Sequence, residues 1–599
     1  MENKKIRVSK QIADWLVEQG IEQVFSVTGG GSMFLNYDLG DHPKLKCTFM
    51  HHEQACAMAA EGYARITGKP ALVMVTTGPG PINAMNGVYG AFTDSIPMIV
   101  ISGQIKRDTC VSFYDLPNLR QLGDQEGPTI AMVSPICKYA KLVRESSDLK
   151  TMLPEAYAQA IGGRPGPVWL DIPLDIQNST EELNIPSYCP IADPQETDLR
   201  NECQILIEKL KSSKRPLILG GTGVRLADAK DRLLALIERL GIPLSTAWTH
   251  DLIRSDHPLF AGRPGAIGTR AGNFCLQGAD FVLVLGSRLN IRQTGYNWNA
   301  FAQDAWLAHV DVDPAELDKP TIKPDQPIVA DINQFLDCFE TMILETKLPS
   351  YNEWAVWCRD IGNKYAAIND HSQIPGSPLN PYIVVDRIFQ QLRDNDIIAC
   401  GNASACILPF QVGNLKSEQR LFSNSGSASM GYDLPAAIGA SVADKGRVIC
   451  FAGDGSLQMN IQELQTLKTA GTNLIVVVLN NKGYLSIKQT HENFFGKIIG
   501  ATPDSGVDFP DFAAVAEAYG LRSATISNEQ DLTTLDELIQ SNGPLLINIM
   551  VDPDQSFAPR MKARLDDNGN FIPQYLDDMF PFLDPQEIKS VRESAKAIK

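Results

Sequence analysis

Short apolar runs without charged side chains recur along the chain, and segments with helical periodicity separate them. Three examples are residues 70–75 (PALVMV), 97–102 (PMIVIS) and 474–480 (LIVVVLN). Strands that are apolar on both faces lie between two layers of helices, which is typical of parallel sheets in α/β folds. The chain is therefore predicted to form doubly wound α/β domains with mainly parallel sheets.

Breaks in this alternation divide the 599 residues into three domains. Stretches such as IPSYCPIADPQETD and SQIPGSPLNP are typical of linkers. We expect domains at residues 1–175, 190–345 and 370–555, followed by a tail at 556–599. The turn formers and spaced aromatics of the tail predict a segment that wraps over the surface near the third domain, where it would act as a lid on the active site.

The first and third domains share a pattern. Residues 75–103 and 451–481 each read as a strand, a Gly-x-Gly turn, a Met-Asn pair, a helix and a second strand. This spacing is a weak indication that the two domains are related. Coincidence is the alternative, because such units recur widely in α/β proteins.

The overall charge limits the partners of the chain. A formal net charge of -17 argues against nucleic acid or an anionic membrane as the main partner, since either would normally need a basic face. The 12 cysteines include no CxxC pair, and several lie in apolar runs, which is typical of reduced thiols in the core. No signal-peptide pattern and no membrane-spanning run is present, so a cytoplasmic location is expected.

Two polar groups flank one strand-helix-strand unit. Asp454 lies in Gly453-Asp454-Gly455-Ser456 at the end of one strand, and Asn481 follows the next strand. The carboxyl ends of neighbouring parallel strands meet at one sheet edge, where backbone N–H groups favour phosphate. Carboxylate and amide oxygens suit Mg²⁺. The alternative is two ordinary turns, each common by itself.

These residues resemble the thiamine diphosphate motif. MHHEQACAMAAEGYARITG and TTGPGPINAMNGVYGAFTDSIPMIVISGQ resemble the pyrimidine-binding domain of the acetohydroxyacid (acetolactate) synthase-like family. The resemblance covers nearly the whole chain. It implies pyrimidine-binding, central and diphosphate-binding domains, thiamine diphosphate and Mg²⁺ as cofactors, and a homodimer or homotetramer with active sites at subunit interfaces. The implied reaction is decarboxylation of a 2-oxo acid, pyruvate, with carboligation to a carbonyl acceptor.

The resemblance also implies roles for individual residues. Glu53 matches the glutamate that hydrogen-bonds N1′ of the cofactor's aminopyrimidine ring, and Met430 matches the apolar residue that bends the cofactor. Asp454, Asn481 and the Gly483 carbonyl would bind Mg²⁺. The other expected cofactor contacts, beside Met430 and Asn481, are Gly78, Pro79, Asn83, Gly401, Asn402, Gly453, Gly455, Ser456, Tyr484 and Leu485.

The central domain resembles the part of the family that binds FAD. The similar stretches are DHPLFAGRPGAIGT and GSRLNIRQTG, although Ile267 replaces a family histidine and Asn290-Ile291 replaces an aspartate pair. The resemblance implies FAD as a structural passenger, because the reaction transfers no net electrons. A tight turn without a nucleotide is the alternative for Gly220 to Gly223. The expected FAD contacts are Gly220, Gly265, Thr269, Arg288 and Asp313.

The chain departs from the family where the acceptor substrate binds. Arg292 aligns with the arginine that grips the carboxylate of the second 2-oxo acid, and an interdomain ion pair is the alternative. Thr490 replaces a family tryptophan and Lys488 an apolar residue, while LGDQEG keeps Gln125 but carries Asp124 for a phenylalanine. A pocket with fewer aromatics and more polar groups predicts a larger or more polar acceptor. A solvated Lys488 without a role is the alternative.

Three functions remain open at this point. The first is an acetolactate synthase-like carboligase. The second transfers the two-carbon unit to a keto sugar or aldehyde, or acts as a C–C lyase or hydrolase on a diketone or 2-hydroxyacyl substrate. The third is an inactive scaffold or regulatory homologue, which the intact set of Glu53, Met430, Asp454 and Asn481 argues against.

Overall fold

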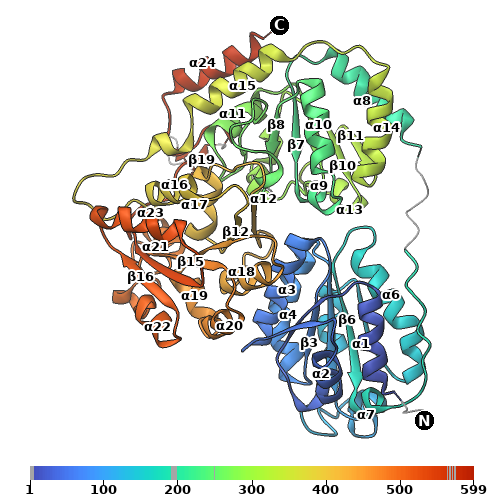
Figure 1. Ribbon diagram of the computed structural model, residues 1–599. Helices are drawn as coiled ribbons and strands as arrows, with labels where there is room; N and C mark the ends of the chain where they lie inside the picture. The colour runs from blue at the N-terminus through green and yellow to red at the C-terminus, as the bar shows by residue number, and fades with distance from the viewer. Residues whose placement is uncertain are drawn as a thin grey trace.

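The computed structural model describes residues 6–190, 198–248, 250–562, 564–565, 568, 571–572 and 575–598. These residues form three domains, each with a parallel sheet covered by helices (Figure 1). The prediction of doubly wound α/β domains is confirmed. Parts of the predicted linker at 185–198 and of the predicted tail at 556–599 lie outside the described residues.

The first domain contains a six-stranded sheet in the order β2-β1-β3-β4-β6-β5. Strands β3, β4 and β6 are buried along their whole length, which explains their continuous apolar sequences. The strands are β1 (Gln23–Ser26), β2 (Lys46–Phe49), β3 (Leu72–Val75), β4 (Met98–Gln104), β5 (Tyr139–Leu142) and β6 (Pro167–Pro173). The helices are α1 (Val8–Glu18), α2 (Met33–Gly40), α3 (Glu53–Thr67), α4 (Pro79–Thr93), α5 (Thr129–Val133), α6 (Leu149–Ile161) and α7 (Leu174–Asn178).

The central domain contains a five-stranded sheet in the order β11-β10-β9-β7-β8. The chain runs from β7 to β8 on one side and to β9 on the other, so a topological switch point lies between β7 and β9. The strands are β7 (Pro216–Gly220), β8 (Leu244–Thr246), β9 (Phe281–Leu285), β10 (Trp306–Asp311) and β11 (Gln326–Val329). The helices are α8 (Arg200–Ser212), α9 (Thr222–Leu226), α10 (Lys230–Leu240), α11 (Arg270–Gly278), α12 (Ile291–Thr294), α13 (Pro314–Leu317), α14 (Ile332–Leu344) and α15 (Asn352–Lys364).

The third domain repeats the topology of the first. Its sheet order is β13-β12-β14-β15-β17-β16, so both domains have the order 2-1-3-4-6-5 when strands are numbered within each domain. The shared topology favours two related domains over coincidence. The strands are β12 (Ile397–Cys400), β13 (Arg420–Ser423), β14 (Val448–Gly453), β15 (Leu474–Asn480), β16 (Arg522–Ile526) and β17 (Leu545–Met550). The helices are α16 (Pro381–Gln391), α17 (Ser404–Val412), α18 (Asp433–Val442), α19 (Asp454–Met459), α20 (Glu463–Ala470), α21 (Leu485–Phe494), α22 (Phe512–Ala518) and α23 (Leu532–Gln540).

Two helices outside the predicted central range of 190–345 pack on the central domain. In α15 the indole of Trp354 donates a hydrogen bond to the Pro216 carbonyl at 2.9 Å. Beyond a short antiparallel pair, β18 (Arg564–Leu565) and β19 (Phe571–Ile572), α24 (Pro585–Lys596) lies beside α15 (Figure 1). Ile588 and Val591 of α24 join the central apolar core. The end of the tail therefore lies on the central domain and not near the third domain as predicted.

Helices α3 and α18 join the first domain to the third through two close backbone contacts. A Cβ atom at Gly439 would lie 1.8 Å from the Ala59 carbonyl oxygen, and one at Gly62 would lie 2.1 Å from the Ala436 carbonyl oxygen. Both distances are far shorter than any van der Waals contact, so only glycine allows the two helices to approach this closely.

We therefore expect Gly439→Ala to lower the unfolding midpoint temperature, because overpacking a close contact costs about 1–3 kcal/mol. Gly362→Ala is the matched control, since it lies inside α15 with nothing within 4 Å of its added Cβ. That change is expected to raise stability slightly through helix propensity. Differential scanning calorimetry measures the unfolding midpoint temperature of both variants. Equal midpoints in the two variants would refute the close-contact argument.

Candidate active site

The third domain places Asp454 at the carboxyl end of β14, as the first residue of α19. Its Oδ1 accepts a hydrogen bond from the Gly455 N–H at 2.7 Å, and its Oδ2 accepts one from the Gly483 N–H at 3.1 Å. Burial raises the pKa of Asp454 to about 6. The carboxylate is therefore desolvated but held in place by backbone donors from two neighbouring strand ends.

Two further oxygen-bearing groups, the Asn481 amide and the Gly483 carbonyl, converge beside this carboxylate. The side-chain amide of Asn481 lies 3.3 Å from Asp454 Oδ2 and 2.7 Å from the Gly483 carbonyl oxygen. With its NH₂ turned inward, the amide donates to both oxygens. With its carbonyl turned inward, it completes a set of three oxygens of the kind that hard divalent cations bind. These residues fit a magnesium ion, and they come together because β14 and β15 are adjacent.

The other expected contacts in the third domain surround this cluster. The Ser456 hydroxyl accepts a hydrogen bond from the Gly431 N–H at 2.9 Å, next to Met430. The Asn402 amide donates to the Ala428 carbonyl at 3.0 Å, which brings the end of β12 to the same loop. The structure therefore gathers the strand ends that carry Gly401, Asn402, Gly453, Gly455 and Ser456 near Met430.

The first domain places Glu53 at the start of α3, where it is 9% exposed. Its Oε2 accepts a hydrogen bond from the Asn83 amide of α4 at 3.0 Å. At Gly78, before Pro79 of α4, the backbone has φ +66°, and a Cβ would lie 2.4 Å from the Gln125 carbonyl oxygen. The structure thus brings Glu53 close to Asn83, and Gly78 close to Gln125. Among the described residues no hydrogen bond or ion pair joins Glu53 to Asp454.

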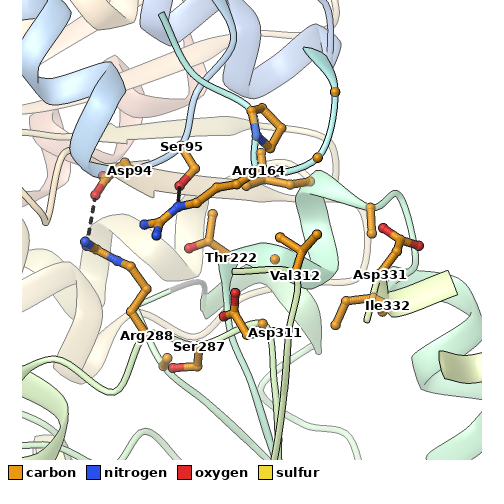
Figure 2. Close-up of a pocket in the computed structure, with 18 of the residues that line it drawn as sticks. Asp94, Ser95, Arg164, Thr222, Ser287, Arg288, Asp311, Val312, Asp331 and Ile332 are labelled. Atoms are coloured by element: carbon orange, nitrogen blue, oxygen red, sulfur yellow. Dashed lines mark hydrogen bonds and ion pairs between the residues drawn. The ribbon is translucent and has the colours of Figure 1, made fainter. Parts of the chain in front are cut away.

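A cavity of about 420 Å³ opens at the switch point of the central sheet (Figure 2). Its floor includes Thr222 after β7, Ser287 and Arg288 after β9, and Asp311 at the end of β10. Ligands of open α/β sheets bind at such a point. The first domain covers the cavity and the third domain reaches it at one residue, so all three domains meet there.

Only part of the residue set expected for FAD lines this cavity. Arg288 does, and Asp313 binds the rim residue Arg164 at 2.8 Å. Gly220 ends the strand below the cavity. Gly265 and Thr269 do not line it: the Gly265 N–H donates to Asn273, and the Thr269 hydroxyl caps α11 by accepting from the Gly272 N–H.

Sequence reasoning missed the residues with which the first domain covers the cavity. Arg164 donates to the Ser95 hydroxyl at 2.8 Å, and Arg288 lies 3.5 Å from Asp94 (Figure 2). Asp94 and Ser95 lie within the stretch that resembles the pyrimidine-binding domain, but the resemblance assigned them no role. Arg164 lies in a Gly- and Pro-bearing turn, GGRPGP, outside the quoted stretches.

The predicted acceptor residues have different surroundings. Arg292 lies on α12 with its guanidinium 5.9 Å from the centre of the Trp248 ring, and it forms no ion pair within the described part of the chain. Lys488 on α21 pairs with Asp554 and donates to the Pro553 carbonyl at 3.2 Å. The Thr490 hydroxyl donates to the Ser486 carbonyl within its own helix at 2.8 Å. The Lys488 side chain is only 15% exposed, so it is not solvated.

No helix in the described ranges combines the length and apolar character needed to cross a bilayer.

Comparison with known proteins matches all three domains. Residues 6–125 match the family model of the thiamine pyrophosphate enzyme N-terminal TPP binding domain, residues 203–339 that of the central domain, and residues 403–549 that of the C-terminal TPP binding domain.

Two relatives match almost end to end. The acetolactate synthase large subunit of Lactococcus lactis is 31% identical over 573 residues, which cover 94% of this chain and 96% of the relative. The acetolactate synthase isozyme 1 large subunit of Escherichia coli is 31% identical over 566 residues, covering 93% and 96%. With three matched domains and this identity along nearly its whole length, the chain belongs to the thiamine pyrophosphate enzyme family, as an enzyme of the acetolactate synthase type.

Proposed function

We propose that this enzyme decarboxylates pyruvate and joins the remaining two-carbon unit to a second carbonyl compound, with thiamine diphosphate and Mg²⁺ as cofactors. With a second pyruvate as acceptor, two pyruvates give acetolactate and CO₂. The observation that carries the proposal is the convergence of Asp454, Asn481 and the Gly483 carbonyl beside a glycine turn. The names of the relatives support the choice of reaction.

Each half of the site would hold one part of the cofactor. Asp454, Asn481 and the Gly483 carbonyl would bind Mg²⁺, and the N–H groups of the 453–456 turn would bind the diphosphate. Bound thiamine diphosphate supplies an electron sink for loss of CO₂ and for formation of the new C–C bond. Glu53, buried and fixed by Asn83, would hold a proton at N1′ of the aminopyrimidine ring. Met430 would press on the cofactor from the 424–432 loop.

The substrate end of the site would use Arg292, which lies over the Trp248 ring and forms no ion pair in the described part of the chain. The unpaired guanidinium of Arg292 suits an acceptor carboxylate, which it can bind through two parallel hydrogen bonds. An ordinary interdomain ion pair, the alternative for this residue, is not formed within the described ranges.

A complete active site would need a second copy of the chain. Glu53 and Asp454 make no contact with each other, and α4 next to Glu53 presents an apolar face with Ile82 52%, Tyr89 45% and Phe92 38% exposed. We propose that a second copy covers this face, so that each active site combines the first domain of one subunit with the third domain of the other. FAD in the central cavity would be a structural passenger.

The metal cluster makes a direct prediction about cofactor binding. Asp454→Asn should weaken Mg²⁺-dependent binding of thiamine diphosphate by more than the roughly 10–100-fold that loss of an outer-shell partner costs. Asp444→Asn is the matched control, because Asp444 is exposed and asparagine tolerates its φ of +53° equally well. Calorimetric titration with and without EDTA measures both, and unchanged affinity in the Asp454 variant would place the metal elsewhere.

A second prediction concerns Glu53. Glu53→Gln should lower the rate of CO₂ release from pyruvate by about 10²–10⁴-fold, the usual contribution of a positioned proton-transfer group. Exchange of the C2 proton of bound thiamine diphosphate, followed by NMR, should slow with it, while cofactor affinity and the circular dichroism spectrum stay the same. Glu353→Gln, an exposed residue in the first turn of α15, is the control. Wild-type exchange in the Glu53 variant would assign the proton transfer to another group.

A different acceptor is the second candidate function, and the observation that favours it is the chemistry of α21. Where the family has a tryptophan and an apolar residue, this chain has Thr490 and the Lys488–Asp554 pair. Replacing a tryptophan by threonine removes bulk, and a keto sugar or an aldehyde with polar substituents would use the room.

The two functions are separated by the products formed from ¹³C-labelled pyruvate. We expect acetolactate to accumulate with thiamine diphosphate and Mg²⁺, and we expect Arg292→Ala to raise the KM for the second pyruvate without a matching loss of CO₂ release. NMR of the reaction mixture identifies the product. Slow CO₂ release without acetolactate would reject pyruvate as the acceptor and support the second candidate.

A further inference from the structure

The loop at residues 424–432, called the Met430 loop here, is tied to the first domain by four hydrogen bonds. The bonds are between Asn424 and Glu61 (3.2 Å), the Gly426 N–H and Asp94 (3.0 Å), Ser429 and Asn86 (2.7 Å), and Tyr432 and Glu61 (3.1 Å). All of these partners lie on α3 or at α4 and its end. The position of Met430 therefore depends on polar groups of the first domain as well as on Ser456 and Asn460 of its own domain, which bind Gly431.

Asp94 is the partner in this set that also reaches the central cavity. Its Oδ2 accepts a hydrogen bond from Arg65 at 2.6 Å, and Arg65 is bound in turn to the fully buried Glu61 at 2.7 and 2.9 Å. Its Oδ1 serves two groups, the Gly426 N–H at 3.0 Å and the Arg288 guanidinium at 3.5 Å. The Met430 loop and a residue of the cavity thus share one carboxylate oxygen.

Arg288 is the weaker of these two partners and the one that a ligand can reach. Its side chain is 31% exposed and lines the cavity, whereas the Asp94 side chain is 7% exposed (Figure 2). Ser425, the residue before Gly426, lines the same cavity. An occupant of the cavity would therefore touch both Arg288 and the Met430 loop.

The lining of the cavity indicates the class of ligand. Two guanidiniums, from Arg164 and Arg288, face it from opposite domains, and the Gly-rich turn after β7 lies at the switch point of the sheet. Guanidinium groups bind phosphate bidentately, and backbone turns at switch points accept diphosphates. The carboxylate of Asp311 at the end of β10 suits ribose hydroxyls. A phosphate-bearing nucleotide matches this set.

We propose that a phosphate-bearing nucleotide in the central cavity fixes the Met430 loop by drawing Arg288 away from Asp94. Asp94 Oδ1 is then left to the Gly426 N–H, while Arg65 stays on Oδ2. A carboxylate oxygen that no longer shares itself with a second cation binds its remaining donor more strongly. The fixed loop presents Met430 to the cofactor, so nucleotide and thiamine diphosphate strengthen each other's binding. The first step of this proposal is the effect of the nucleotide on the Met430 loop, and it does not rest on the proposed function. The second step is the strengthening of thiamine diphosphate binding, and it does rest on the proposed function.

Hydrogen–deuterium exchange of peptides covering 424–432 in the full-length protein tests the first step without thiamine diphosphate. ADP and FAD serve as probes at saturating concentration. We expect either probe to slow exchange of this segment about fivefold or more, the lower end of usual allosteric couplings. Binding of a probe without a change in the loop would overturn the proposal, and so would failure of both probes to bind.

Arg288→Gln separates this mechanism from a general structural role. Without its competitor, Asp94 binds Gly426 at all times, so the variant without nucleotide should exchange as slowly as the wild type with nucleotide. A residue that merely supports the fold would instead loosen the loop when replaced. Arg164→Gln is the matched control, because the Arg164 guanidinium binds Ser95, Asp313 and Glu316 but not the loop. In this variant a saturating nucleotide should still slow hydrogen–deuterium exchange of the loop. Faster exchange in the Arg288 variant would overturn the proposal.

The second step is measured as the Kd of thiamine diphosphate at fixed Mg²⁺, with and without saturating ADP. We expect ADP to lower this Kd about fivefold or more in the wild type and to leave it unchanged in the Arg288 variant. A loop that responds to ADP in a protein that binds no thiamine diphosphate would reject the proposed function and leave the loop mechanism standing. A responding loop with an unchanged Kd would reject the coupling itself.

Discussion

The close packing of α3 against α18 is the contact on which the rest of this structure depends. It is possible only because Gly62 and Gly439 let each backbone approach a carbonyl of the other helix. Since α3 begins at Glu53 and α18 begins three residues after Met430, this contact fixes both residues. The family resemblance implies that Glu53 binds N1′ of the cofactor and that Met430 bends it. A shift between the two helices would move both residues at once.

Each half of the site is supported by the other domain of the same chain. His51 and Gln54, on either side of Glu53, are bonded to the third-domain residues Glu463 (3.2 Å) and Asn460 (3.3 Å). In the opposite direction, Glu61 and Asp94 of the first domain hold the Met430 loop. Catalytic groups act best when packing and hydrogen bonds around them lock their positions. Reciprocal support of this kind holds each half in position within one chain, ready for the second copy that would complete the proposed site.

Buried charges join the central domain to the same unit. Arg420 of the third domain bonds Asp251 of the central domain at 2.6 Å and the Arg65 carbonyl of the first at 2.8 Å. Glu61 is fully buried at this junction, and this burial raises its pKa to about 7. Burying charges is costly unless each has a partner, so removing one member of the network leaves the others uncompensated. Formation of the three sheets would not by itself determine how the domains pack together. The contacts at this junction specify one arrangement of the three domains.

The sequence predicted the parts of this molecule that depend on local pattern. Uncharged apolar runs became buried parallel strands, and Asp454 and Asn481 came together because adjacent strands end at one edge. Contacts between distant segments were missed. Arg164, Asp94 and Ser95 meet the central domain only through tertiary packing, and α24 returns to the central core from the far end of the chain.

At the acceptor end of the site, polar residue types in the sequence did not predict polar groups available to a substrate. Lys488 and Thr490 suggested a polar pocket, but Lys488 is neutralised by Asp554, 66 residues further along, and the Thr490 hydroxyl is used within its own helix. The charge of Lys488 is therefore already paired, and the single hydroxyl hydrogen of Thr490 is already used. The change from the family pattern is therefore mainly a loss of aromatic volume, while Arg292 keeps the free charge. The substitutions on α21 supply space and not new polarity. If Arg292 binds the acceptor carboxylate as proposed, the choice of acceptor would then depend on the shape of the space beside its guanidinium.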